Sequence, residues 1–298
     1  MRKAWLLAGL VLVLACARER GAPRRAEDKR APPERIVSLS PSATEILYGI
    51  GAFDRVVAVS NYCTYPPEVE RLPRVGNWLS ANMEQLASLR ADLIIMSDAQ
   101  AHFLQSRLSA LGVRTLVVES QTLQDAFHAI AAIGRAVGNE RQAVELERAT
   151  RARVEEVQRR TRGLARPGVL CIVDRVPGTL RDLYTASEGS FIAELIEAAG
   201  GRSVAPRAGT GYGKLTKEAL LVLNPVIIID MVQGAKGRLG EDPRRVWNEL
   251  SDLAAVQNGR VYSLEETSLL HPSQFVAETA RRFAEIIHPE VFGHGDRP

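Results

Sequence analysis

Short apolar runs separated by helical patterns fill the first half of the chain. Four of these runs have the length and β-branched composition of buried strands: Ile36–Leu39, Val56–Val59, Leu93–Met96 and Leu116–Val118. This alternation is typical of parallel βα units, in which each strand is followed by a helix that covers the sheet. The first half therefore predicts one complete α/β lobe.

Three capping patterns predict where helices of this half begin. In Ser42-Ala-Thr-Glu45 the hydroxyl can accept from the third amide while the carboxylate reaches back, which is the arrangement of a capping box. Asn82 precedes a second helical pattern, and Thr122 precedes a third that ends at Gly138.

The segment that follows, residues 139–162, contains neither Gly nor Pro and has a narrow apolar stripe that includes Ala143, Leu146 and Val154. It predicts a single long helix. At about 1.5 Å per residue this helix spans roughly 36 Å, enough to pass along one whole lobe.

The α/β pattern restarts after Pro167. Strands are expected at Val169–Val173, Val226–Asp230 and Arg260–Leu264, and helices at Ser190–Ala199, from Thr216, after Pro243 and from Pro272. The stretch from Leu86 to Ile95 aligns without a gap with the stretch from Leu220 to Ile229, although two common βα units can also resemble each other by chance. We expect two Rossmann-like α/β lobes with parallel sheets, joined by the single long helix, with a ligand cleft between them.

The first residues have the features of an export signal. A basic start is followed by an apolar run that is too short to cross a bilayer and stops at Cys16. Val13-Leu14-Ala15-Cys16 resembles the lipobox of bacterial lipoproteins, and the alternative is a plain secretory signal in which Cys16 is incidental. The next residues are rich in Arg, Glu and Pro, which predicts a disordered tether. The expected organisation is a lipoprotein signal peptide (1–16), tether (17–34), first lobe (35–138), connecting helix (139–163), second lobe (164–290) and tail (291–298).

Composition narrows the function classes. Hydrophobic residues make up 46% and charged residues 24%, which are globular values, and the net charge is only +3. The basic residues are scattered and not interleaved with aromatic residues, so no nucleic-acid partner is expected. Cys63 and Cys171 cannot make a disulfide framework; a bridge between them stays open, but their expected places in different lobes argue against it.

Sequence signatures of catalysis are missing. Gly209-Thr-Gly-Tyr-Gly-Lys214 invites a phosphate-loop interpretation, but Ala208 and Leu215 stand where that motif needs glycine and a hydroxyl. A glycine-rich surface loop with one exposed aromatic residue fits better. Of the five histidines only His102 and His271 fall on cleft-side segments, and two histidines without a clear carboxylate partner do not make a zinc or manganese site.

Aromatic residues are only 5% of the chain, and several fall on connecting segments: Tyr62, Tyr65, Trp78, Tyr184 and Tyr212. In open parallel sheets, ligands bind at the carboxyl ends of strands, where such segments gather. Tyr and Trp offer wide flat faces with a polar edge. Any one of them could instead fill the core of its own lobe, but the joint placement of Tyr62, Trp78, Tyr184 and Tyr212 favours a cleft.

These segments resemble a known family. Ile36-Val-Ser-Leu-Ser-Pro-Ser-Ala-Thr-Glu45, Val57-Ala-Val-Ser-Asn-Tyr-Cys-Thr-Tyr-Pro-Pro67 and Val75-Gly-Asn-Trp78 are similar to the solute-binding proteins of ABC importers for iron-siderophores, haem and cobalamin, in particular to the cobalamin binders. Ser190–Gly201, Leu221–Pro225 and Asn258–Leu264 match more loosely. The likeness covers residues 35–288.

The resemblance implies a ligand held between two lobes with little hinge closure. It puts Tyr62 and Trp78 on the wall of the first lobe, and Tyr184 and Tyr212 on that of the second. It further implies that His271 stands where cobalamin binders carry an Arg near the ligand, and that Ser97 replaces an aromatic residue; both differences bear on which ring system binds. Family members dock onto the importer through a surface carboxylate on each lobe. Glu218 matches the second, while the first falls near His102 and is not assigned.

We therefore expect a lipid-anchored solute-binding protein, not an enzyme, that captures a corrinoid such as cobalamin as transported ligand, without a cofactor, and delivers it to a permease dimer. A ferric-siderophore or haem binder of the same family is the alternative, favoured if His102 and His271 face the cleft. An enzyme or sensor domain on the same scaffold is the third. The protein is expected to be a monomer, exported to the periplasmic or cell-surface side and anchored to the membrane through Cys16. The exact ligand, its affinity, the leaflet and the permease stay open.

Overall fold

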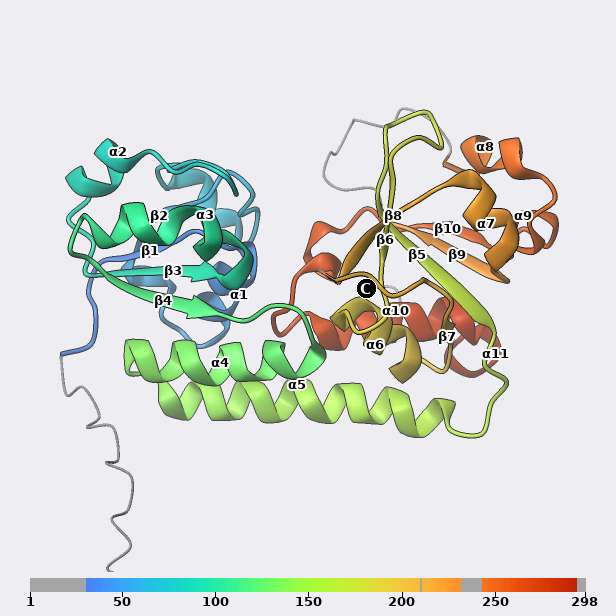
Figure 1. Cartoon of the computed structure of the whole chain (residues 1–298). Coiled ribbons are helices and arrows are strands. Elements are labelled where there is room, and N and C mark those ends of the chain that lie inside the picture. Colours follow the sequence, from blue (N-terminus) through green and yellow to red (C-terminus); the bar gives the residue numbers. More distant parts are fainter. Residues whose placement is uncertain (1–30, 210, 232–242, 294–298) are drawn as a thin grey trace, which may run out of the picture. The chain divides into compact units, whose positions relative to one another are not determined.

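The computed structural model describes residues 31–209, 211–231 and 243–293. The expected signal peptide, Cys16 and most of the tether and tail lie outside these ranges. From Pro32 onward the chain forms one compact unit, in which Figure 1 shows two α/β lobes above a pair of helices. No helix among the described residues is both long and apolar enough to cross a membrane.

The first lobe is built on a parallel sheet in the order β2-β1-β3-β4. Its strands are β1 (Ile36–Ser38), β2 (Val56–Val59), β3 (Leu93–Ser97) and β4 (Arg114–Val118). Every residue of β3 is buried, as expected for a central strand covered on both faces. The covering helices are α1 (Pro41–Gly49), α2 (Met83–Ser88) and α3 (Asp98–Ser109), with short 3₁₀ turns at Phe53–Arg55 and Pro67–Arg71.

The predicted helix starts are confirmed at two of three sites. The Asn82 side chain accepts from the Gln85 amide, and Thr122 forms a capping box with Asp125. The predicted capping box of Ser42 and Glu45 is wrong, because α1 begins at Pro41 with Ser40 at its N-cap and no side-chain cap. Proline at the first helical position has no amide hydrogen to satisfy and is preset for the helix, which moves the start forward.

The second lobe contains a mixed sheet in the order β10-β9-β5-β6-β8, not the fully parallel sheet that we expected. Its parallel part is β5 (Gly168–Asp174), β9 (Ile227–Asp230) and β10 (Val261–Ser263), with β7 (Arg202–Ser203) pairing alongside β5. Its antiparallel part is β6 (Leu183–Ala186) and β8 (Tyr212–Leu215). The predicted surface loop at residues 209–214 is therefore partly strand, and Tyr184 and Tyr212 lie on neighbouring strands instead of loops.

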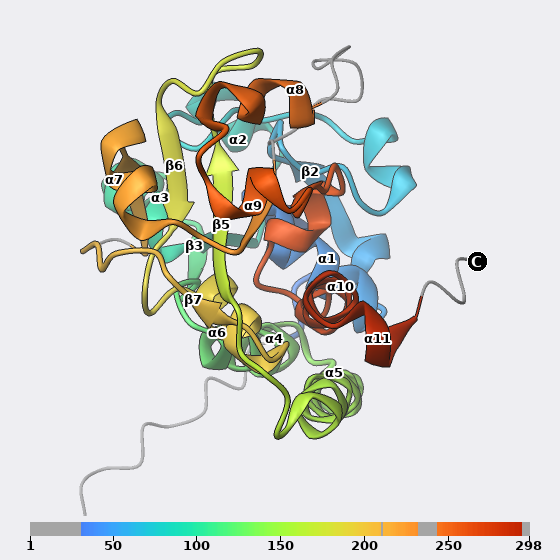
Figure 2. The ribbon, with the colours of Figure 1, turned by 90° about the vertical axis from the view of Figure 1, so that its right-hand side faces the viewer.

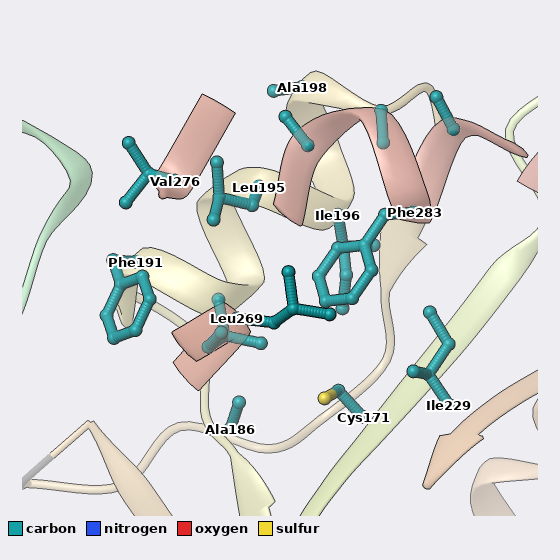
Figure 3. Packing of buried hydrophobic residues seen from close by; sticks show 14 of the residues in the cluster. Cys171, Ala186, Phe191, Leu195, Ile196, Ala198, Ile229, Leu269, Val276 and Phe283 are labelled. Carbon is teal, nitrogen blue, oxygen red and sulfur yellow. The ribbon is translucent and has the colours of Figure 1, made fainter. Parts of the chain in front are cut away.

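Two helices close one face of this sheet. Helix α6 (Phe191–Ala198) and helix α10 (Val276–Ile287) bury one face each against the strands, and Figure 3 shows Phe191, Leu269, Phe283 and Cys171 in the core that they form. The remaining elements are α7 (Lys217–Leu223), α8 (Pro243–Trp247), α9 (Ala254–Gln257), α11 (Pro289–Phe292) and the 3₁₀ turns Asn248–Leu250 and Thr267–Leu270.

The two lobes share a pair of helices, α4 (Leu123–Val137) and α5 (Glu140–Thr161), which run side by side beneath them (Figures 1 and 2). Helix α5 is the predicted connecting helix, and it contributes to both cores through Ala143 and Val154. Helix α4 does the same through Ile130 and Phe127. The helices approach closely at Gly134, where an added Cβ would lie 2.2 Å from the Ala143 Cβ. The lobes are therefore connected by a packed pair of helices, α4 and α5, and not by the single long helix that the sequence predicted.

The similarity between the stretch from Leu86 to Ile95 and the stretch from Leu220 to Ile229 is also present in the structure. From Asn82 to Asp92 the succession of exposed and buried positions is the same as from Thr216 to Val226. Thr216 caps its helix as Asn82 does, and Leu86 and Leu220 are both fully buried. A non-glycine residue with positive φ follows each helix within two residues of its end, Arg90 in one lobe and Asn224 in the other. The two βα units therefore have the same local structure.

Candidate ligand cleft

A cavity of about 1030 Å³ lies between the two lobes. The first lobe lines it with the start of α1, the segments after β2 and β3, and the loop after β4; the second lobe with the end of β5, strands β6 and β8, the start of α6 and the loop before α10. This volume is at the upper end of the range for small-molecule sites, so the cleft suits a large ligand.

The structure brings all six predicted ligand-binding residues to this cavity: Tyr62, Trp78, Ser97, Tyr184, Tyr212 and His271. The four aromatic side chains are 38–51% exposed, so their faces are accessible from the cleft and do not fill a core. Tyr65 behaves differently, because its ring packs edge-on against Tyr48 and Phe275. That the six residues contact a ligand stays a prediction.

Hydrogen bonds between side chains and the backbone hold the first aromatic wall in place. The Arg74 guanidinium donates to the carbonyls of Ser60 and Cys63 and so fixes the turn that carries Tyr62. Beside it, the Asn77 side chain accepts from the amides of Leu79 and Ser80, which encloses Trp78 in a tight turn. Gly76 is required there, because its φ is +124° and a Cβ would lie 2.4 Å from the Ser80 carbonyl oxygen. Tyr62 and Trp78 are therefore presented by rigid loops.

The second aromatic wall is part of the sheet. Tyr212 on β8 pairs with Ala186 on β6, and Lys214 pairs with Tyr184. Directly paired residues and residues two apart share a face, so both tyrosines lie on the same side of this antiparallel ribbon. Burial raises the pKa of the Tyr212 hydroxyl, which therefore stays protonated and able to donate, while 38% of the residue remains exposed.

His271 has a partner that the sequence did not reveal. Its Nδ1 lies 2.6 Å from Oε1 of Glu45 on α1 of the first lobe, and the Ser273 hydroxyl donates to the other carboxylate oxygen at 2.6 Å. The Gln274 amide donates to the Glu45 carbonyl. Glu45 is 1% exposed, so a buried carboxylate joins the lobes at the cleft. The sequence feature that could have indicated this contact is a Glu next to Ile46 and Leu47, on the apolar side of a helix.

Ser97 is 1% exposed, and it serves mainly to position a helix. It caps α3 in a reciprocal box with Gln100, whose amide also donates to the Leu39 carbonyl at 2.6 Å. Helix α3 carries Asp98 and His102, and both line the cleft. Sequence reasoning missed Asp98, together with Asp174 at the end of β5 on the opposite side. Thus both His102 and His271 face the cleft, the condition that we attached to the haem and siderophore alternative.

Within residues 31–209, 211–231 and 243–293 no three His, Cys, Asp or Glu side chains are grouped so as to hold a metal ion. Cys63 and Cys171 are free and buried, and each belongs to the core of a different lobe.

The family model described as periplasmic binding protein matches residues 36–267. The chain belongs to this family. The vitamin B12-binding protein of Vibrio cholerae is 29% identical over 247 residues, covering 82% of this chain and 86% of that protein. The uncharacterized ABC transporter substrate-binding lipoprotein YvrC of Bacillus subtilis is 29% identical over 264 residues, covering 87% and 82%.

Solved structures of this periplasmic binding protein family have the same two-lobed fold. The periplasmic vitamin B12 binding protein BtuF of Vibrio cholerae superposes with a TM-score of 0.74 at 25% identity, over 87% of this chain and 98% of that one. A periplasmic heme binding protein from Pseudomonas aeruginosa gives the same TM-score at 22% identity, over 87% and 94%, which is evidence for the fold alone. The family and these neighbours are solute-binding proteins, so this chain binds a solute and is not an enzyme.

The similar local structure of residues 82–92 and 216–226 identifies the first-lobe residue that is equivalent to Glu218, the predicted docking carboxylate. Glu218 is exposed at the second position of α7, and the helix start lowers its pKa through hydrogen bonds from its own amide and from Thr216. The residue at the same place in the first lobe is Glu84, exposed at the second position of α2. Glu84 therefore occupies the position in the first lobe that Glu218 occupies in the second, whereas His102 lies on α3.

Proposed function

We propose that this chain is the solute-binding component of an ABC importer, and that it captures a corrinoid in the cleft and delivers it to the membrane permease. The observation that carries the proposal is a cavity of about 1030 Å³ with flat aromatic side chains on both walls, Tyr62 and Trp78 facing from one lobe and Tyr184 and Tyr212 from the other. A large ring with apolar faces and a polar margin fits such walls, because Tyr and Trp combine broad apolar area with hydrogen-bonding edges.

Similarity to named relatives supports a corrinoid. The chain is 29% identical to a protein named vitamin B12-binding protein and 28% identical to the cobalamin-binding protein of Halobacterium salinarum. In both cases the match covers more than four fifths of this chain.

Contacts between the lobes support reversible capture in a preformed cleft. Besides the Glu45 contacts, the Phe191 amide donates to the Gln121 carbonyl at 2.6 Å, and Glu194 accepts from the Leu123 amide. Apolar area buried on binding contributes about 25 cal/mol per Å². A cleft that is already ordered loses little of this to conformational entropy.

Haem or a ferric siderophore is the second candidate. It is favoured by His102 and His271, which line the cleft and could ligate iron. Calorimetric titration with cobalamin, cobinamide, haem and a ferric hydroxamate separates the candidates. Binding of a corrinoid is the expected result; heat from an iron compound alone would contradict it.

We further propose that Glu84 and Glu218 dock the protein onto the permease dimer. They are exposed carboxylates at equivalent positions of the two lobes, as a partner with two similar docking sites requires. Attachment to the membrane through a lipid on Cys16, on the exported side, completes the proposal. Mass spectrometry of the protein from its native membrane tests it, because lipidation of Cys16 adds the mass of acyl chains, whereas an unmodified Cys16 contradicts anchoring.

A further inference from the structure

The Asp, Glu, Lys and Arg side chains in the described lining of the cleft are all carboxylates. Its described lining includes two carboxylates, Asp98 from the first lobe and Asp174 from the second, and no Lys or Arg. The chain has 38 Lys and Arg residues against 35 Asp and Glu, so a shortage of basic residues does not explain this selection.

Hydrogen bonds hold both carboxylates in place. The Ser120 hydroxyl donates to Asp98 Oδ1 at 2.7 Å, and the Arg175 amide donates to Asp174 Oδ1 at 2.9 Å. Neither carboxylate has an ion-pair partner among the residues that the structure describes.

Arg175, the cation next to Asp174 in sequence, forms its ion pair in the interior of the second lobe and not in the cleft. The Arg175 side chain is fully buried, and its Nε donates to Asp230 Oδ2 at 2.9 Å. Asp230 also accepts from the indole nitrogen of Trp247 at 2.8 Å. This arrangement keeps the guanidinium in the interior of the second lobe, so the carboxylate of Asp174 alone meets the cleft.

We infer that Asp98 and Asp174 determine specificity by charge, and that the cleft accepts macrocycles whose margin bears amide groups and rejects those whose margin bears carboxylates. The inference rests on the proposed function and narrows its ligand class. An amide N–H can donate to either carboxylate, whereas a carboxylate on the ligand meets a like charge in a partly desolvated site, and such contacts strongly disfavour a partner. A haem, with two propionates, is disfavoured for the same reason.

Two ligands that differ mainly in the charge of their margin test this selection. Cobinamide and cobyrinic acid share the corrin ring and the cobalt, but the margin of the first bears amides and that of the second bears carboxylic acids. Used as dicyano complexes, they also have the same axial ligands. We expect the full chain, purified in detergent, to bind cobinamide at least about tenfold more tightly than cobyrinic acid at low ionic strength, with a smaller ratio in high salt.

The variant with Asp98→Asn and Asp174→Asn should reduce this ratio about tenfold or more, mainly by gaining affinity for the acid. Asn keeps the acceptor for Ser120, and a thermal melt checks the fold. The control is Glu84→Gln with Glu218→Gln, which removes the same charge outside the cleft and should keep the ratio. Equal ratios in both double variants, with cobinamide still bound, would overturn the charge selection and leave corrinoid binding intact. Binding of neither corrinoid would overturn the proposed function and this inference together.

Discussion

Glu45 Oε1 lies 2.6 Å from Nδ1 of His271, so that a buried carboxylate of the first lobe meets a cleft-lining imidazole of the second. The two residues are 226 positions apart in the chain. Ser273 and Gln274 add two further hydrogen bonds to the same glutamate. Together with helices α4 and α5, this contact sets the spacing of the two aromatic walls.

Replacing Glu45 by Ala should lower the free energy of unfolding by about 2–4 kcal/mol, because the buried Ser273 hydroxyl and the partly buried His271 imidazole lose their partner. Chemical denaturation measures the change. Glu70→Ala, an exposed glutamate of the same lobe, is the control and should change stability by less than about 0.5 kcal/mol. Equal stabilities of the two variants would show that the contact between the lobes is not formed.

Trp78→Ala should weaken ligand binding by about 1–3 kcal/mol, because the indole face that stacks on the ring is lost. The neighbouring Leu79 is 65% exposed and does not line the cleft, so Leu79→Ala should leave the affinity unchanged. Titration calorimetry of both variants makes the comparison. An unaltered affinity in a folded Trp78→Ala variant would remove this residue from the binding wall.

Exchanging Glu84 and Glu218 for Lys should reduce uptake through the importer about tenfold or more while leaving ligand affinity in solution unchanged, because repulsion replaces attraction at both docking sites. Transport into vesicles that contain the permease gives one readout and calorimetry the other. Glu70→Lys serves as the control for an exposed charge elsewhere. Normal uptake by the Glu84 and Glu218 variant would contradict the docking proposal.

The two core thiols should be unreactive in the folded protein. Burial raises the pKa of both Cys63 and Cys171, so that at pH 8 the thiolate fraction is smaller than for a free cysteine. Alkylation by iodoacetamide, followed by peptide mapping, should therefore be slow in buffer and complete in guanidinium chloride. Rapid modification of Cys171 in the native protein would be inconsistent with its place beneath Phe283 (Figure 3).

The features that could be predicted from sequence are those that depend on neighbouring residues. Asn82, Thr122, Ser190 and Thr216 each cap the helix that follows within a few residues, and the apolar runs of β3 and β9 are buried on both faces. Tyr62 and Trp78 could be found because they lie in family motifs, and Tyr184 and Tyr212 because aromatic residues are rare and these two fall between predicted elements.

What could not be predicted depends on contacts between distant segments. Strands β6 and β8 are only four residues long and partly exposed, and only their mutual pairing identifies them as strands. Glu45 satisfies the spacing of a capping box, but its actual partners, His271 and Ser273, lie in the other lobe. Asp98 and Asp174 have no motif, and only the folded chain brings them to one cavity.

The most direct test is a calorimetric titration with cobinamide of the unaltered protein and of a variant with one aromatic residue removed from each wall, Trp78→Ala and Tyr184→Ala. We expect one ligand per chain in the unaltered protein and an affinity at least about thirtyfold lower in the variant, since each wall contributes on the order of 1–3 kcal/mol. Equal binding by the two proteins, or no binding by either, would contradict a corrinoid held between these aromatic walls.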